Sequence, residues 1–386
     1  MNFRLNEEQL LIRDSVRQLS REKIEPRARD IDVSEMYPED VFQLFRDQGL
    51  LGLTIPADEG GTGAGVLALC LAVEEVAWVC SSSAKILALS QFYTLPLLIA
   101  GTKDQKQEYL APAASGMKRG AFALTEPNGG SDVGSMVARA IDTDEGYVIS
   151  GEKLFVSGGP QADYMIFFAK LGSLEGNEGL TAFILPTDSP NLFQLRQDRG
   201  LGVRGVPHPD YAVEDYLLSK DLRLGAEKGG YEIARRTLNA MQAVTAARAL
   251  GLAERCLTLA IDYATTRKIY GGSLSDMGVI RSRMADMALE VEAARLLTYQ
   301  AASLIDEGKD LLEIEPYLSA AKVFASEMAV RAASETMEIM GGHGYMTEYP
   351  VERWYRDARQ LVHYALPNDV HRDRIAQALI DRKLSY

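Results

Sequence analysis

The sequence predicts an α+β protein built from a helical N-terminal domain, a middle β domain and a C-terminal helical bundle. Residues 1–118 repeat apolar side chains at the three-to-four-residue period of helices. Residues 119–225 contain short runs rich in Val, Ile, Phe and Tyr between Gly, Asp, Asn and Ser clusters, as strands do. Residues 226–386 return to long helical runs joined by short loops, a pattern typical of antiparallel bundles.

Three stretches of the first domain support its helical assignment. Asn6 is placed to cap a helix over "NEEQLLIRDSVRQLSREKI", in which Leu10 and Val16 lie near one stripe. The glycines of "IPADEGGTGAG" lack the spacing of a phosphate-binding loop, so this stretch is expected to connect two helices. The run "ILALSQFYTLPLLIAG" is interrupted by polar residues and Pro96, which predicts a buried helix or pair of helices rather than a membrane span.

The middle domain holds the stretch that is richest in chemistry, "AFALTEPNGGSDVGSM". Thr125 and Ser131 offer hydroxyl groups, while Gly129 and Gly130 allow close backbone approach. Successive N–H groups in such a loop can bind an anion. On these residues alone, the alternative to a ligand-binding loop is a β-turn that carries polar side chains. Further along, "DEGYV" predicts the turn of a hairpin between two strands.

Composition and charge restrict the classes of function. The formal net charge of −13 disfavours nucleic-acid binding, which needs clustered Lys and Arg. The three cysteines are far apart and the four histidines form no HExxH motif, so neither a disulfide framework nor a metal site is expected. The N-terminus is charged from its start and has no apolar signal core. We therefore expect a cytoplasmic protein that does not enter a membrane.

Several motifs together resemble those of the acyl-CoA dehydrogenases, a family of FAD-dependent enzymes. "FALTEPNGGSD" is similar to the family's flavin loop, and "GEKLFVSGG" to its second flavin strand. "LGVRGVPH", "YATTRKIYGG", "MADMALEVEAARLLTYQAA", "KVFASEMA" and "IMGGHGYMTEYPVERWYRDAR" follow in the family's order and extend the resemblance over nearly the whole chain. The resemblance implies a barrel-like or sandwich-like β domain, a four-helix bundle and a homotetramer. It also implies an acyl thioester substrate, bound to CoA or a carrier protein, with electron-transfer flavoprotein as a candidate electron acceptor.

The resemblance further implies which residues hold the FAD. Phe155 stands where the family usually has tryptophan, and Ser157 where it often has threonine. Arg267 is expected to reach the FAD pyrophosphate across a subunit interface as a charge-assisted contact. The full set expected at the cofactor is Phe122, Leu124, Thr125, Gly130, Ser131, Phe155, Ser157, Arg267, Tyr270, Glu338 and Gly342.

The resemblance fails at the residue that would remove a proton from the substrate. Dehydrogenation in this family needs a carboxylate that takes the proton α to the thioester carbonyl. Counted from the "RDA" motif, its usual position is Ala365, and Pro367 replaces a hydroxyl that normally helps to hold FAD. The alternative position used by a minority of the family is Met241. His363 and Tyr364 are the nearest replacement candidates, although a structural role explains each of them more simply.

Lys85 provides a second departure, because it interrupts an otherwise apolar run. Glutaryl-CoA dehydrogenases, and a related desulfinase that acts on a sulfinate-bearing acyl-CoA, carry arginine at the matching position. A cation at this point favours an acidic acyl group, whereas a lysine that snorkels from a helix surface is the alternative. The full set expected at the substrate is Lys85, Gln91, Ser131, Asn239, Met241, Gln242 and Tyr364.

Three functions follow from this pattern. The first is a flavoprotein oxidoreductase that acts on an acyl thioester, with a non-standard base or none. The second is a flavin-containing lyase that acts on an acidic acyl-CoA in the manner of a desulfinase, a reaction that tolerates the loss of the base. The third is a catalytically silent member that keeps the fold. The retained hydroxyls of Thr125, Ser131 and Ser157 favour a bound flavin and so disfavour the third.

Overall fold

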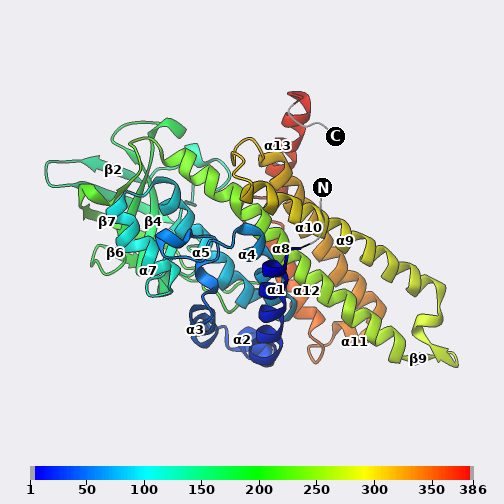
Figure 1. Cartoon of the computed structure of the whole chain (residues 1–386). Helices are drawn as coiled ribbons and strands as arrows, with labels where there is room; N and C mark the ends of the chain where they lie inside the picture. The colour runs from blue at the N-terminus through cyan, green and yellow to red at the C-terminus, as the bar shows by residue number, and fades with distance from the viewer. Residues whose placement is uncertain (1–4, 383–386) are drawn as a thin grey trace.

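The computed structural model describes residues 5–382, so the first four residues of the charged N-terminal run lie outside the described part. Its elements follow the helical–β–helical order that the sequence predicts (Figure 1). As predicted, Asn6 caps the first helix: its side chain accepts the Gln9 N–H at 2.8 Å, and the Gln9 side chain accepts the Asn6 N–H. The N-terminal helices are α1 (Glu7–Leu19), α2 (Ala28–Ser34), α3 (Glu39–Asp47), α4 (Val66–Val79), α5 (Ser81–Ala100), α6 (Lys103–Gln105) and α7 (Ala111–Ala114).

Helices α4 and α5 form the centre of the N-terminal region. Both are apolar around most of their circumference, which suits helices that are enclosed by protein on all sides. The run with Pro96 forms one continuous helix, α5, rather than a pair of helices. Helix α5 is long and apolar enough to cross a membrane, but 78% of its most apolar window is buried inside the protein, as in a core helix. This helix carries Lys85.

The middle region is an eight-stranded sheet in the order β6-β7-β3-β2-β4-β5-β8, with β1 pairing with β4. The strand pairs are antiparallel except that β4 runs parallel to β1 and β2. The predicted hairpin turn joins β2 to β3, where the Thr143 N–H donates to the Gly146 carbonyl at 2.8 Å. The strands are β1 (Gly120–Ala123), β2 (Arg139–Asp142), β3 (Tyr147–Lys153), β4 (Tyr164–Leu171), β5 (Leu180–Pro186), β6 (Leu192–Gln194), β7 (Tyr211–Leu218) and β8 (Arg223–Leu224).

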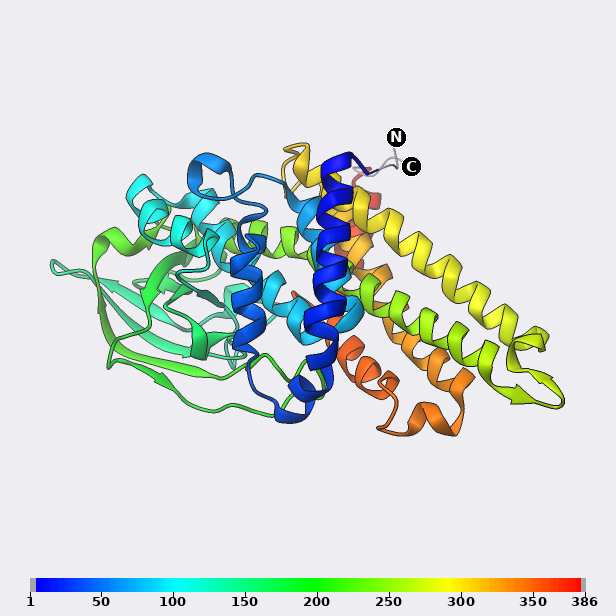
Figure 2. The same cartoon turned by 60° about the horizontal axis from the view of Figure 1, so that its bottom comes forward.

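The C-terminal region is dominated by three long helices, of which α8 packs against α4, α5, α9 and α10. Figures 1 and 2 show the small β9–β10 hairpin at the end of the bundle that lies farthest from the eight-stranded sheet. The elements are α8 (Gly230–Thr266), β9 (Lys268–Ile269), β10 (Gly272–Ser273), α9 (Gly278–Asp306), α10 (Glu315–Met340), α11 (Gly342–Tyr345), α12 (Val351–Leu361) and α13 (Asn368–Ile380).

Candidate functional site

A cavity of about 490 Å³ lies where α5, the end of β3, the loop after β1 and the turn between α12 and α13 meet. Its size is in the range of ligand-binding pockets, and most of its wall is apolar. The lining residues are Lys85, Leu89, Phe92, Phe122, Leu124, Thr125, Gly130, Ser131, Leu154, Phe155, Ser157, His208, Leu238, Gln360, His363, Tyr364, Ala365, Leu366 and Pro367. Seven of the residues expected at FAD and three of those expected at the substrate, with Ser131 in both groups, therefore share one cavity.

The loop after β1 is held by a buried ion pair. The Nζ of Lys153, at the end of β3, donates to Glu126 Oε1 at 2.6 Å and to the Leu124 carbonyl at 3.3 Å. Glu126 also accepts the backbone N–H groups of Val137 and Ala138. Burial lowers the pKa of Lys153 to about 8, and the nearby Glu126 carboxylate opposes this shift. The pair thus fixes both ends of the segment that carries Thr125, Gly130 and Ser131.

The cavity suits a flat aromatic cofactor. Phe155 lines it with a φ of 57° and remains 62% exposed, so a ligand ring would cover an apolar surface that the protein leaves open. Next to Gly130, an added Cβ would meet only the Thr125 methyl group at 3.9 Å, so this side of the loop is open to a ligand. The hydroxyls of Ser131 and Ser157 also line the cavity, and Ser157 Oγ lies 3.4 Å from His208 Nδ1.

Another wall of the cavity is the turn between α12 and α13. Ala365 and Leu366 adopt left-handed φ values of 50° and 81°, which non-glycine residues adopt only under strain. Lys322 from α10 donates to the carbonyls of Val362 and Leu366 at 3.0 and 2.8 Å. Burial lowers the pKa of Lys322 to about 7. The turn is therefore held in place by a buried lysine.

Lys85 reaches the cavity from the interior of α5 and is only 1% exposed. The alternative of a lysine on a helix surface is therefore wrong. Its Nζ lies 3.3 Å from His208 Nε2 and 4.8 Å from the centre of the Tyr364 ring. Burial, and secondarily the positive charge of Arg248, lower the pKa of Lys85 well below its usual value. Burial and the Lys85 charge lower the pKa of His208 to about 3, so this imidazole is uncharged near neutral pH.

None of the lining residues is an Asp or a Glu. His363 lines the cavity and belongs to the turn after α12. Asp369 lies on α13 with its carboxylate 3.3 Å from Arg372, and its side chain is 94% exposed. Within the described part of the chain, no group of three or more His, Cys, Asp or Glu side chains could hold a metal ion.

Four residues expected at the substrate do not line the cavity. Gln91 is buried and accepts the Thr54 hydroxyl at 2.8 Å. Asn239 donates to the Leu311 carbonyl at 3.0 Å, and Met241 is fully buried. Gln242 donates to the Ala365 carbonyl at 3.0 Å, so it supports the turn from behind.

Four residues expected at FAD lie in the distal part of the C-terminal region. Arg267 ends α8 beside β9, and Tyr270 follows in the β9–β10 hairpin with 91% exposure. Glu338 and Gly342 lie at the junction of α10 and α11 and are exposed. None of these four residues is among those that line the cavity, and Figures 1 and 2 show the hairpin far from the sheet.

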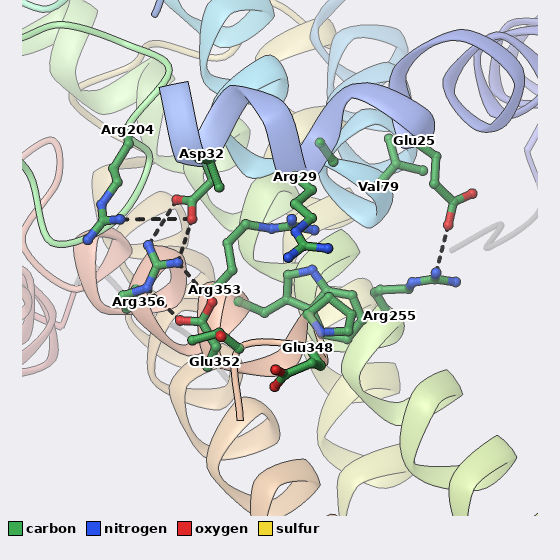
Figure 3. A pocket seen from close by; sticks show the side chains of 15 residues that line it. Glu25, Arg29, Asp32, Val79, Arg204, Arg255, Glu348, Glu352, Arg353 and Arg356 are labelled. Atoms are coloured by element: carbon green, nitrogen blue, oxygen red, sulfur yellow. Dashed lines mark hydrogen bonds and ion pairs between the residues drawn. The ribbon is translucent and has the colours of Figure 1, made fainter. Parts of the chain in front are cut away.

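A second hollow, of about 510 Å³, lies between α2 and α12 (Figure 3). Asp32 accepts two hydrogen bonds from Arg356, at 2.9 and 2.6 Å, and lies 4.0 Å from Arg204. Glu25 pairs with Arg255 at 2.7 Å. These ion pairs join the N-terminal helices to the bundle. Much of the charge in this hollow is therefore neutralised by other side chains of the protein.

Two basic groups near the first cavity were not anticipated from the sequence: His208, which lines it, and Arg248, which lies behind it. His208 follows a proline within one of the family-like motifs. Arg248 interrupts the Ala-rich apolar run "AVTAARALGLA", and a charge in such a run is the signal that could have identified it.

Comparisons with known proteins cover nearly the whole chain. Family models described as the N-terminal, middle and C-terminal domains of acyl-CoA dehydrogenase match residues 6–117, 121–216 and 228–380. An acyl-CoA dehydrogenase of Bacillus subtilis is 36% identical, covering 97% of this chain and 99% of that protein. The structure of butyryl-CoA dehydrogenase from Megasphaera elsdenii is 33% identical with a TM-score of 0.95, covering 98% of this chain and 100% of that one. A glutaryl-coenzyme A dehydrogenase structure in complex with glutaryl-CoA is 31% identical with a TM-score of 0.95, covering 99% and 97%.

Proposed function

Because the chain belongs to the acyl-CoA dehydrogenase family, we propose that it acts with FAD on an acyl thioester whose acyl group ends in an acidic group. The observation that carries this proposal is the wall of the cavity, which contains the buried Lys85 and no carboxylate. An ammonium group in such a place favours an anionic ligand group. No carboxylate among the lining residues would repel that ligand group.

FAD, when bound, supplies the acceptor for a hydride in this family. We propose that Thr125 and Ser157 hydrogen-bond the flavin ring and that Phe155 covers one of its edges, because all three line the cavity. Arg267, Tyr270, Glu338 and Gly342 would then serve the cavity of a second copy. Their exposed positions away from their own cavity support this arrangement and the homotetramer that it requires.

The residues of this chain would divide the remaining work. Phe92, Phe122 and Tyr364 exclude water with their rings, and the turn at Ala365 closes the acyl end of the cavity. Ala365 cannot accept a proton, so proton removal requires another group, such as a basic nitrogen of the cavity. The three free, buried cysteines agree with the reducing cytoplasm that we propose as its location.

A second candidate is a lyase that removes the acidic group of the acyl chain. The bond between carbon and that group breaks, its electrons stay on the carbon, which takes up a proton, and the group departs as carbon dioxide or sulfur dioxide. The absence of Asp and Glu from the lining residues favours it, because such a reaction does not begin with removal of the α-proton. Anaerobic titration of the purified protein with glutaryl-, succinyl- and butyryl-CoA separates the two. Loss of the flavin absorbance supports oxidation, and turnover without that loss supports elimination. Binding of none of the three, without spectral change, would contradict both and indicate a silent member.

Replacing Lys85 by alanine is expected to weaken the binding of succinyl-CoA by about tenfold and to leave that of butyryl-CoA nearly unchanged. The reason is the loss of the ammonium that faces the cavity. The pH dependence has a defined sign. Because the pKa of Lys85 is lowered, its ammonium loses the proton at a lower pH than an exposed lysine, and the affinity for succinyl-CoA falls as pH rises through that pKa.

The measurement is the dissociation constant of each ligand from the flavin spectrum at several pH values. Lys85→Arg is the matched control, because it keeps the charge and should retain succinyl-CoA binding without the fall at high pH. An equal loss of affinity for both ligands in Lys85→Ala would reject the proposed role.

A further inference from the structure

Arg248 is a buried arginine whose charge has no ion-pair partner among the described residues. It lies on α8 and is 0% exposed. Its Nη2 donates to Gln360 Oε1 at 2.9 Å and to Ser81 Oγ at 3.4 Å, while its Nε and Nη1 have no hydrogen-bond acceptor. The guanidinium group stays charged in proteins, so α8 carries a fixed positive charge into the interior.

A buried charge of this kind destabilises the folded state unless a group of opposite charge compensates it. A buried charge normally has a paired and hydrogen-bonded partner, as Lys153 has in Glu126. Asp357 is the carboxylate whose charge acts on Arg248. It accepts the Val203 N–H at 2.6 Å and makes no ion pair with Arg248. The neutralising charge is therefore not supplied by the described residues.

The position of Arg248 connects it to the cavity. Its guanidinium carbon lies 5.4 Å from the centre of the Tyr364 ring, and the Lys85 Nζ lies 4.8 Å from the same ring. Its partner Gln360 and Tyr364 both line the cavity, and the Tyr364 hydroxyl is itself buried without a partner. Two basic side chains thus flank one wall residue, and Arg248 acts from behind that wall rather than on it.

We infer that Arg248 is a specificity-determining residue that, from behind the Tyr364–Gln360 wall, selects acyl thioesters whose acyl group ends in a carboxylate or a sulfinate. This inference rests on the proposed function and adds a second charge to it. In a site that excludes water, the attraction between a fixed positive charge and an anion is stronger than at a surface. The bound anion supplies the negative charge that the interior lacks, and Lys85 contacts it directly, with Arg248 raising the local potential. Arg248 is thus a positioning and electrostatic residue, and not a catalytic one.

The test compares two ligands in the flavin-loaded protein and its variants. Arg248→Met removes the charge at similar volume and is expected to raise the dissociation constant of succinyl-CoA by about tenfold relative to that of butyryl-CoA. Arg248→Lys keeps the charge and should preserve the wild-type ratio of the two constants. If Arg248→Met does not fold, Arg248→Gln removes the charge while keeping a donor for Gln360, and the same change of ratio is expected.

Different outcomes separate this inference from the proposed function. If the wild-type protein binds succinyl-CoA and butyryl-CoA equally well, the proposed acidic acyl group is wrong. If the wild type prefers succinyl-CoA and the uncharged variants keep that preference, the role of Arg248 is overturned and that of Lys85 stands. A parallel loss of affinity for both ligands would show that Arg248 only supports the wall, which also overturns the inference.

Discussion

Replacing Ala365 by glutamate is expected to raise the rate of butyryl-CoA oxidation by about 10²- to 10⁴-fold, the usual contribution of a positioned general base. Ala365 lines the cavity, and none of the other lining residues is a carboxylic acid. The new carboxylate would project from the turn between α12 and α13, whose backbone is already left-handed at this residue. Since alanine and glutamate both carry a Cβ, the substitution adds no backbone strain of its own.

The rate is measured as flavin reduction after rapid anaerobic mixing with butyryl-CoA. Ala365→Gln is the matched control, because it has the same shape without a basic oxygen, and it should leave the rate at the wild-type level. A wild-type rate that is already high, and that Ala365→Glu does not increase, would show that another group of the cavity already removes the α-proton. That result would contradict the absence of a working base.

Replacing Lys153 by methionine is expected to lower the free energy of unfolding by about 3–5 kcal/mol, as when one partner of a buried ion pair is removed. Glu126 would remain fully buried with only backbone N–H groups as donors. Because this pair holds the loop that carries Thr125, Gly130 and Ser131, the variant should also retain less FAD. Urea unfolding gives the first quantity, and the ratio of flavin to protein absorbance gives the second.

Lys170→Met is the control for this prediction. Lys170 is buried on strand β4 of the same sheet, but its partner Glu175 is 70% exposed, so water can solvate the carboxylate that the substitution leaves behind. A loss of about 1 kcal/mol or less is expected, as for exposed ion pairs. Equal losses in the two variants would contradict the special role of the Lys153–Glu126 pair.

Much of the fold could be predicted because it depends on local patterns. The cap at Asn6 and the hairpin turn between β2 and β3 each follow from side chains within a few residues of the feature. For the run with Pro96 the sequence left open one buried helix or a pair, and the structure has one helix, α5, that continues through Pro96. Helix α5 is enclosed by other elements, and this packing outweighs the local effect of the proline.

The candidate site was only partly predictable. Thr125, Ser131 and Ser157 lie in motifs whose order along the chain is recognisable, and they do meet in one cavity. Gln91 and Gln242 stand at positions expected at the substrate, yet their side chains bond to the Thr54 hydroxyl and to the Ala365 carbonyl of the turn. Sequence position alone does not reveal whether such a side chain will bind a ligand or another group of the protein.

The sequence by itself determined the family, the order of helical and β regions, and the presence of alanine where an acid is usual. Only the tertiary structure decided that no Asp or Glu is among the described residues that line the cavity, and that Lys85, His208, Arg248 and Tyr364 gather at one wall. These residues are separated by tens to hundreds of positions, so their contacts arise from the packing of α5 and α8 against the sheet and the final turn. The role inferred for Arg248 depends on its burial and on its lack of an ion-pair partner among the described residues. Both are properties of that packing and not of any short stretch of chain.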